Sequence, residues 1–158
     1  MNLPELKNPH IFQKLGRVDA KSLESCDQLL LILTPKPAAS HFKQLPSGDK
    51  MQRVLRKLPA GSTPTFTTRL SNVRQTLVVS GSIAKDASIF EQLTLGRKLV
   101  AEACGKNTGS LGICVIGFSA DQSTSIYNCV IAAALAAAFQ LPSFKSKKSK
   151  APIKSLRL

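Results

Sequence analysis

The sequence predicts an α/β layered domain built around a mixed β-sheet, and three observations lead to this fold class. Residues 29–33 and 111–117 are short, almost continuous apolar runs, which is typical of strands buried on both faces. Two longer segments, 88–104 and 126–139, carry apolar residues through several helical turns without an internal proline. Strand-like and helix-like segments alternate along the chain, and this order favours helices packed on a sheet.

The first half of the chain is expected to hold a buried strand and a short helix. The strand covers residues 27–34 and ends at Pro35. The helix is expected to begin at Asp49, which can cap it, and to end at the Pro-Ala-Gly sequence of residues 59–61. Its lysines and arginines point outward, because its apolar positions recur at the helical period. Those positions are Met51, Val54, Leu55 and Leu58.

Two neighbouring strands and a long helix are expected next. Residues 63–68 are rich in threonine and contain Pro64, which favours an edge strand. Asn72 lies in the turn that leads to a more buried strand at residues 75–79. Residues 81–87 are expected to be a loop before the helix at 88–104. One face of that helix carries Ile89, Leu93, Val100, Ala103 and Cys104.

The last quarter of the chain holds the central strand and an alanine-rich helix. Residues 111–117 are expected to be the central strand, and the helix at 126–139 has small side chains that allow close packing. Candidate caps precede this helix, and Pro142 ends it. Residues 153–158 alternate polar and apolar positions, as in a half-exposed strand or the first strand of something that continues. The candidate caps are Ser119, Asp121 and Ser123.

The composition indicates to which broad class of protein the chain belongs. A chain of 158 residues with 43% hydrophobic and 20% charged residues is typical of one globular domain. No apolar run approaches the roughly 20 residues that span a bilayer, and the N-terminus lacks the apolar core of a secretory signal. We therefore expect a cytoplasmic protein without a membrane partner. The four cysteines show no CxxC spacing, which favours reduced core thiols over a zinc site.

The formal net charge of +13 is high for this length and suggests nucleic acid or another acidic partner. The basic residues are spread along the chain, and there is no tryptophan and only one tyrosine. A surface on which bases stack is therefore not expected. No acidic residue follows Asp121, whereas six lysines and arginines follow it. This basic end is either a solvated tail or a segment that binds polyanions.

Motifs that carry chemistry are incomplete. Residues 117–121, Gly-Phe-Ser-Ala-Asp, resemble a serine-hydrolase elbow, but Asp121 replaces the second glycine and no histidine follows Ser119. Ser119 is better interpreted as a turn or cap residue. Residues 105–109, Gly-Lys-Asn-Thr-Gly, lack the first glycine and the serine or threonine of a phosphate loop. No paired histidines or close carboxylates are present, so no catalytic site is predicted.

One segment near the end of the chain nevertheless carries a recognisable pattern. Residues 137–148, Ala-Ala-Phe-Gln-Leu-Pro-Ser-Phe-Lys-Ser-Lys-Lys, join an alanine-rich helix to the expected strand at 153–158. This junction resembles the end of the N-terminal domain of the leucyl (cytosol) aminopeptidase family. Residues 77–81 and 95–101 are similar to a strand with a glycine-containing loop and to the following helix of that family. The family usually has a tyrosine where this chain has Phe144.

The resemblance implies a three-layer, macro-domain-like α/β fold with a mixed sheet flanked by helices. It divides the chain into a leader or short helix at 1–25, the α/β domain at 26–142, and a basic linker and strand at 143–158 that lead toward a C-terminal catalytic domain. The parent protein is then a hexameric metallopeptidase with two divalent metal ions, zinc or manganese, in that other domain. No residue of this chain matches the family's metal ligands or catalytic residues.

The implied role of this chain is non-catalytic. It would dock against the catalytic domain and contribute to assembly of the hexamer, and the expected docking residues are Phe144, Lys145, Lys147 and Lys148. A linker that merely crosses between domains is the alternative for that segment. The alternative for the whole chain is a free-standing, macro-like module that binds nucleic acid or a nucleotide, for which the charge is the reason.

Overall fold

The computed structural model describes residues 10–12, 26–43, 45, 47–57, 65–104, 109–138 and 153–157. A six-stranded sheet runs through the molecule in the order β1-β6-β5-β2-β4-β3. Every neighbouring pair is parallel except β3 and β4, so the sheet is mixed, as the sequence predicts. The strands are β1 (His10–Phe12), β2 (Gln28–Leu33), β3 (Phe66–Arg69), β4 (Leu77–Ser82), β5 (Ser110–Ile116) and β6 (Ser155–Arg157).

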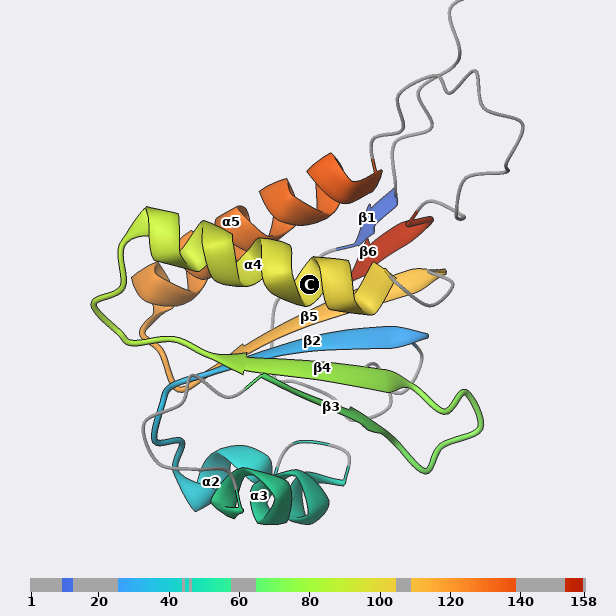
Figure 1. The fold of residues 1–158 in the computed structure, drawn as a ribbon, viewed down its shortest axis with the longest axis vertical. Helices are drawn as coiled ribbons and strands as arrows, with labels where there is room; N and C mark the ends of the chain where they lie inside the picture. Colours follow the sequence, from blue (N-terminus) through green and yellow to red (C-terminus); the bar gives the residue numbers. More distant parts are fainter. Residues whose placement is uncertain are drawn as a thin grey trace, which may run out of the picture.

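Helices cover both faces of the sheet and give the three-layer α/β architecture expected from the sequence (Figure 1). The long helices α4 (Ile89–Cys104) and α5 (Ala120–Ala138) lie together on one face. The short helices α2 (Ala39–Phe42) and α3 (Gly48–Arg56) lie on the other. Two separate hydrophobic clusters result, one on each side of the sheet.

Strand β2 belongs to both clusters, which explains its continuous apolar sequence. Leu30 and Ile32 pack toward α4 and α5, whereas Leu29, Leu31 and Leu33 pack toward α2 and α3. All five side chains are at most 1% exposed. Because successive side chains of a strand point to opposite faces, a strand covered on both sides needs apolar residues at every position. The predicted buried strand is thus confirmed, and β5 beside it is central as expected.

The two long helices begin with similar capping arrangements. Ser88 precedes α4, and its hydroxyl accepts from the Glu91 N–H while the Glu91 carboxylate accepts from the Ser88 N–H. Ser119 and Gln122 make the same exchange at the start of α5. This reciprocal pairing satisfies backbone donors that a helix start otherwise leaves unpaired. Because of the Ser119–Gln122 pair, α5 begins at Ala120, six residues before residue 126, where the predicted apolar pattern begins.

Two element boundaries differ from the expectation for steric reasons. Strand β4 continues through Ser82, although residues 81–87 are expected to be a loop. Gly81 permits this, because the side chains of Leu95 and Leu99 occupy the space where its Cβ would be. Helix α3 begins at Gly48 rather than being capped by Asp49, since Gly48 lies against the Phe42 carbonyl and allows an earlier start.

The apolar face predicted for α4 is only partly correct. The buried positions of this helix begin at Gly96, in its middle, and among them are Leu99 and Val100. Ile89 is 69% exposed and Phe90 is 74% exposed, because the first turn of α4 contributes nothing to the core. Among the described strands, β3 pairs only with β4, so it is an edge strand of the sheet, as the proline and threonines of residues 63–68 predict.

The two ends of the described chain meet at one edge of the sheet. Strand β6 pairs in parallel with β5 on one side and with β1 on the other. The strand expected at 153–158 therefore belongs to this sheet. Strand β1 lies in the segment for which the sequence indicates a leader or short helix, and no periodicity marks it as a strand. Among the described residues, no helix has both the length and the apolar character needed to cross a membrane.

Candidate functional site

The carboxyl ends of the parallel strands form one edge of the sheet, and the chain leaves this edge toward both faces. After β2 it turns to α2 and α3 on one face, whereas after the neighbouring strand β5 it turns to α5 on the other (Figure 1). In open α/β sheets, ligands bind where adjacent strands send their connections to opposite faces. The candidate functional site is therefore the edge formed by the carboxyl ends of β2 and β5.

Three residues meet at this position. Thr34 directly follows β2, Gly117 directly follows β5, and His41 lies on α2. The register places Leu33 beside Ile116, so Thr34 and Gly117 are neighbours. A Cβ on Gly117 would lie 3.1 Å from Thr34 Oγ1 and 3.2 Å from His41 Cε1, and the φ of Gly117 is +91°. The positive φ favours glycine here, and the close approach leaves little room for a Cβ.

Several buried polar atoms on the α2–α3 side of the sheet have no hydrogen-bond partner among the described residues. They are Nδ1 of His41 and the hydroxyl oxygens of Ser80 and Ser82. The two serines alternate along β4 with Gly81, which faces α4, and are only 1% and 5% exposed. A buried polar group without a partner costs about 1–3 kcal/mol. A polar ligand or a water molecule on this side would remove that cost.

Ser119 lies at the same edge but serves as a helix cap. Its hydroxyl accepts the Gln122 N–H at 3.3 Å, and its own N–H donates to Gln122 Oε1 at 3.0 Å. Both Ser119 and His41 are described, and no hydrogen bond joins them. The preferred interpretation of Ser119 as a cap is confirmed, and the serine-nucleophile hypothesis gains no support. Gln122 also donates to the Lys85 carbonyl, which ties the loop before α4 to the start of α5.

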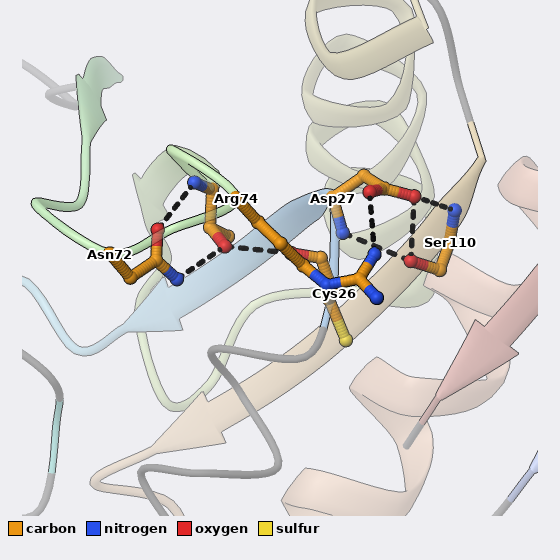
Figure 2. Close-up of polar contacts among 6 residues, drawn as sticks. Cys26, Asp27, Asn72, Arg74 and Ser110 are labelled. Carbon is orange, nitrogen blue, oxygen red and sulfur yellow. Dashed lines mark hydrogen bonds and ion pairs between the residues drawn. The ribbon is translucent and has the colours of Figure 1, made fainter.

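A polar cluster lies at the opposite edge, where the amino ends of β2, β4 and β5 meet (Figure 2). The Ser110 N–H and hydroxyl both donate to Asp27 Oδ2, at 2.8 and 2.9 Å, and the Asp27 N–H donates back to Ser110 Oγ at 2.9 Å. Arg74 Nη1 lies 3.2 Å from Asp27 Oδ1. The Asp27 carboxylate thus joins the start of β5 and the turn between β3 and β4 to β2.

The same cluster continues into the β3–β4 turn. The Thr76 hydroxyl donates to the Cys26 carbonyl at 2.7 Å. Asn72 accepts the Thr76 N–H and donates to the Thr76 hydroxyl, each at 2.9 Å. Asn72 therefore lies in the turn predicted for it. Its side-chain amide makes hydrogen bonds within the turn in place of backbone–backbone hydrogen bonds. These contacts either join the strand starts to one another or hold the β3–β4 turn in shape, so we interpret the cluster as structural.

The charge of Asp27 is stabilised in this arrangement. Partial burial alone would raise the pKa of the carboxyl. The hydrogen bonds from Ser110 and Arg74, together with the Arg74 charge, outweigh this effect and lower the pKa below its usual value. Gly109, next to Ser110, has no room for a side chain, because a Cβ there would overlap Asp27 Oδ2.

The docking residues expected from the sequence, Phe144, Lys145, Lys147 and Lys148, lie outside the described residues. The chain that contains them joins α5 to β6, two elements of one layered unit. The cysteines are thiols rather than disulfides. Among the described residues, no group of three or more histidine, cysteine, aspartate or glutamate side chains could hold a metal ion.

Sequence reasoning missed His41, Thr34 and the Asp27–Ser110 pair. An isolated histidine and threonine carry no motif, and their meeting with Gly117 depends on two strands that are far apart in the chain. The one available signal was Gly117 itself, at the end of a predicted strand, where a glycine often marks close approach. The chain matches no protein-family model, and no curated protein sequence matches it significantly.

Proposed function

We propose that this chain is the non-catalytic N-terminal domain of a leucyl aminopeptidase-like metallopeptidase, an enzyme that removes N-terminal residues from peptides. The observation that carries the proposal is the order of elements around the basic segment. The resemblance requires an alanine-rich helix before the segment and a strand after it. Helix α5 ends at Ala138, and β6 covers Ser155–Arg157. The three-layer α/β fold also agrees with the implied architecture.

In this proposal the chemistry belongs to another domain. Two zinc or manganese ions there would polarise the peptide carbonyl and supply a hydroxide nucleophile. The described residues offer no set of metal ligands, so no metal-dependent step is assigned to them. This domain would instead dock against the catalytic domain and support a hexamer through Phe144, Lys145, Lys147 and Lys148. We also propose a cytoplasmic location, because the cysteines are thiols, as a reducing compartment requires.

The decisive test is to sequence the coding region past the Leu158 codon. We expect about 300 further in-frame residues with carboxylate and lysine metal-ligand motifs, which would give the parent protein a typical two-domain length. A stop codon at that position would overturn the proposal.

The docking role has its own test in the full-length protein. K145E/K147E/K148E should shift the hexamer toward smaller species in size-exclusion chromatography with light scattering. The matched control is K85E/R97E/K98E, which reverses three charges on exposed residues before and within α4. Equal behaviour of the two variants would exclude a specific docking role for the basic segment.

A second candidate function is nucleotide binding at the carboxyl ends of β2 and β5. It is favoured by the meeting of Thr34, His41 and Gly117 where the connections diverge, and by the buried polar atoms nearby without partners. Isothermal titration with ADP-ribose and ATP tests it. T34V and H41A should weaken binding at least tenfold, whereas T124V, an exposed control on α5, should not. Absence of binding to the wild-type chain would exclude this candidate.

A further inference from the structure

The positive charge of the described chain is concentrated on one helical layer. Between Thr34 and Lys57, which includes α2 and α3, there are six lysines and arginines and one acidic residue. Helices α4 and α5 on the opposite face carry two basic and three acidic residues. The sheet separates a strongly basic layer from a nearly neutral one. The cations of the α2–α3 layer are all exposed: Lys36, Lys43, Lys50, Arg53, Arg56 and Lys57.

The cations of α3 form one continuous outer face. Met51 is buried and Val54 and Leu55 are half-buried toward the sheet, which fixes the orientation of the helix. At 100° per residue, the basic residues at 50, 53, 56 and 57 then fall on the opposite side, within about a third of a turn. From Lys50 to Lys57 the helix advances about 10 Å. Asp49 is the one acidic residue on this helix.

The chemistry of this layer favours the backbone of a duplex over a single strand of nucleic acid. A duplex presents about one negative charge per 1.7 Å of its axis, so several phosphates lie within the reach of α3. Binding of single strands relies on exposed aromatic rings on which bases stack. Between Thr34 and Lys57 the one phenylalanine, tyrosine or tryptophan among the described residues is Phe42, and it is 3% exposed. The layer therefore offers charge without a stacking surface.

We propose that the α2–α3 layer binds the phosphate backbone of double-stranded nucleic acid, without reading its sequence. This role goes beyond domain docking and nucleotide binding, and it uses different residues from either. Contacts of lysine and arginine with phosphates release counterions, so the affinity must fall steeply with salt. The slope of log Kobs against log salt concentration reports the number of phosphates contacted.

The test compares two triple variants of the whole chain that lose the same charge from opposite layers. R53Q/R56Q/K57Q removes three cations from α3 and its C-cap, and K85Q/R97Q/K98Q removes three from the α4 side. The probe is a fluorescein-labelled DNA duplex of mixed sequence, and fluorescence anisotropy measures Kobs over a range of salt concentrations. Circular dichroism checks that both variants are folded.

We expect the α3 variant to lose at least tenfold in Kobs and to reduce the salt slope by about 2–3, near 0.9 per lost contact. The α4-side variant should keep the wild-type slope. D49N, which removes the acidic residue of α3, should bind more tightly than wild type.

Three outcomes would overturn the proposal. The first is absence of duplex binding at low salt. The second is an equal loss of affinity in both triple variants, which would show that the affinity depends only on the net charge of the chain. The third is binding to heparin or to an acidic protein without binding to the duplex, which would indicate another class of partner. None of these results bears on the coding-region test, so this proposal can fail while the peptidase proposal stands.

Discussion

Asp27 and Ser110 are 83 residues apart in the sequence, yet they exchange three hydrogen bonds at the amino ends of β2 and β5. The Ser110 hydroxyl donates to the Asp27 carboxylate and at the same time accepts the Asp27 N–H. The next residue before Ser110 is Gly109, whose carbonyl accepts the Lys154 N–H at 2.9 Å. One short segment therefore holds the starts of three neighbouring strands, β2, β5 and β6, together.

Replacing Ser110 should destabilise the protein. S110A leaves the Asp27 N–H without its partner in a partly buried position, and the lost contacts should cost about 1–3 kcal/mol in the free energy of unfolding. Urea denaturation followed by circular dichroism measures this. S71A, in the exposed turn between β3 and β4, is the matched control and should change stability little. If both variants unfold at the same urea concentration, Ser110 has no special structural role.

The Asp27 carboxylate should make stability depend on pH in acid. Its pKa in the folded state is lowered from the ordinary value of 3.8, so the unfolded state binds the proton more readily. Its contribution is present above that value and is lost as the pH falls through the lower folded pKa. We expect the difference in unfolding free energy between wild type and D27N to shrink as the pH is lowered from about 5 to about 2. A constant difference over this range would contradict the assignment.

Gly48 should be far less tolerant of alanine than Gly96, although both lie in helices. A Cβ on Gly48 would overlap the backbone carbonyl oxygen of Phe42, and a backbone atom cannot move aside cheaply. A Cβ on Gly96 would lie 3.3 Å from Val130 Cα, and alanine adds about 1 kcal/mol of helix propensity there. Thermal unfolding should show a much lower Tm for G48A than for G96A. The reverse order would mean that α2 and α3 do not pack as described.

Cys104 should be the thiol that reacts first in the native protein. Burial raises the pKa of the Cys114 thiol to about 12 and also raises the pKa of Cys129, while Cys26 is buried. Cys104 is the partly exposed member of the four. A thiol reagent at pH 8 should label one cysteine quickly, and all four should react after denaturation. Unchanged native labelling of C104S would show that another cysteine is accessible.

The sequence predicts an element well when the signal is local. Apolar residues at every position of β2 indicate burial on both faces, and the threonines and proline before Arg69 indicate an edge. The capping pairs Ser88–Glu91 and Ser119–Gln122 are local too, spaced three residues apart. The exposed Ile89 shows the limit of such patterns, because helical periodicity does not reveal where the sheet beneath a helix ends.

The candidate site could not be predicted because it depends on non-local register. Thr34, His41 and Gly117 meet only after β5 has paired with β2 and α2 has turned onto the opposite face. The basic layer is a similar case. The number of charges can be counted in the sequence. Their concentration on one side of the sheet depends on the fold, because the chain after β2 runs to the face that α2 and α3 cover.

The pairing of β1 with β6 also has a consequence for synthesis on the ribosome. Phe12 pairs with Arg157, and about 140 residues separate the two strands, so β1 stays without its partner until nearly all of this chain has been translated. Strands β2, β4 and β5 and their helices can assemble earlier, as each finds its neighbour within a shorter length of nascent chain. The edge formed by β1 and β6 should therefore close last.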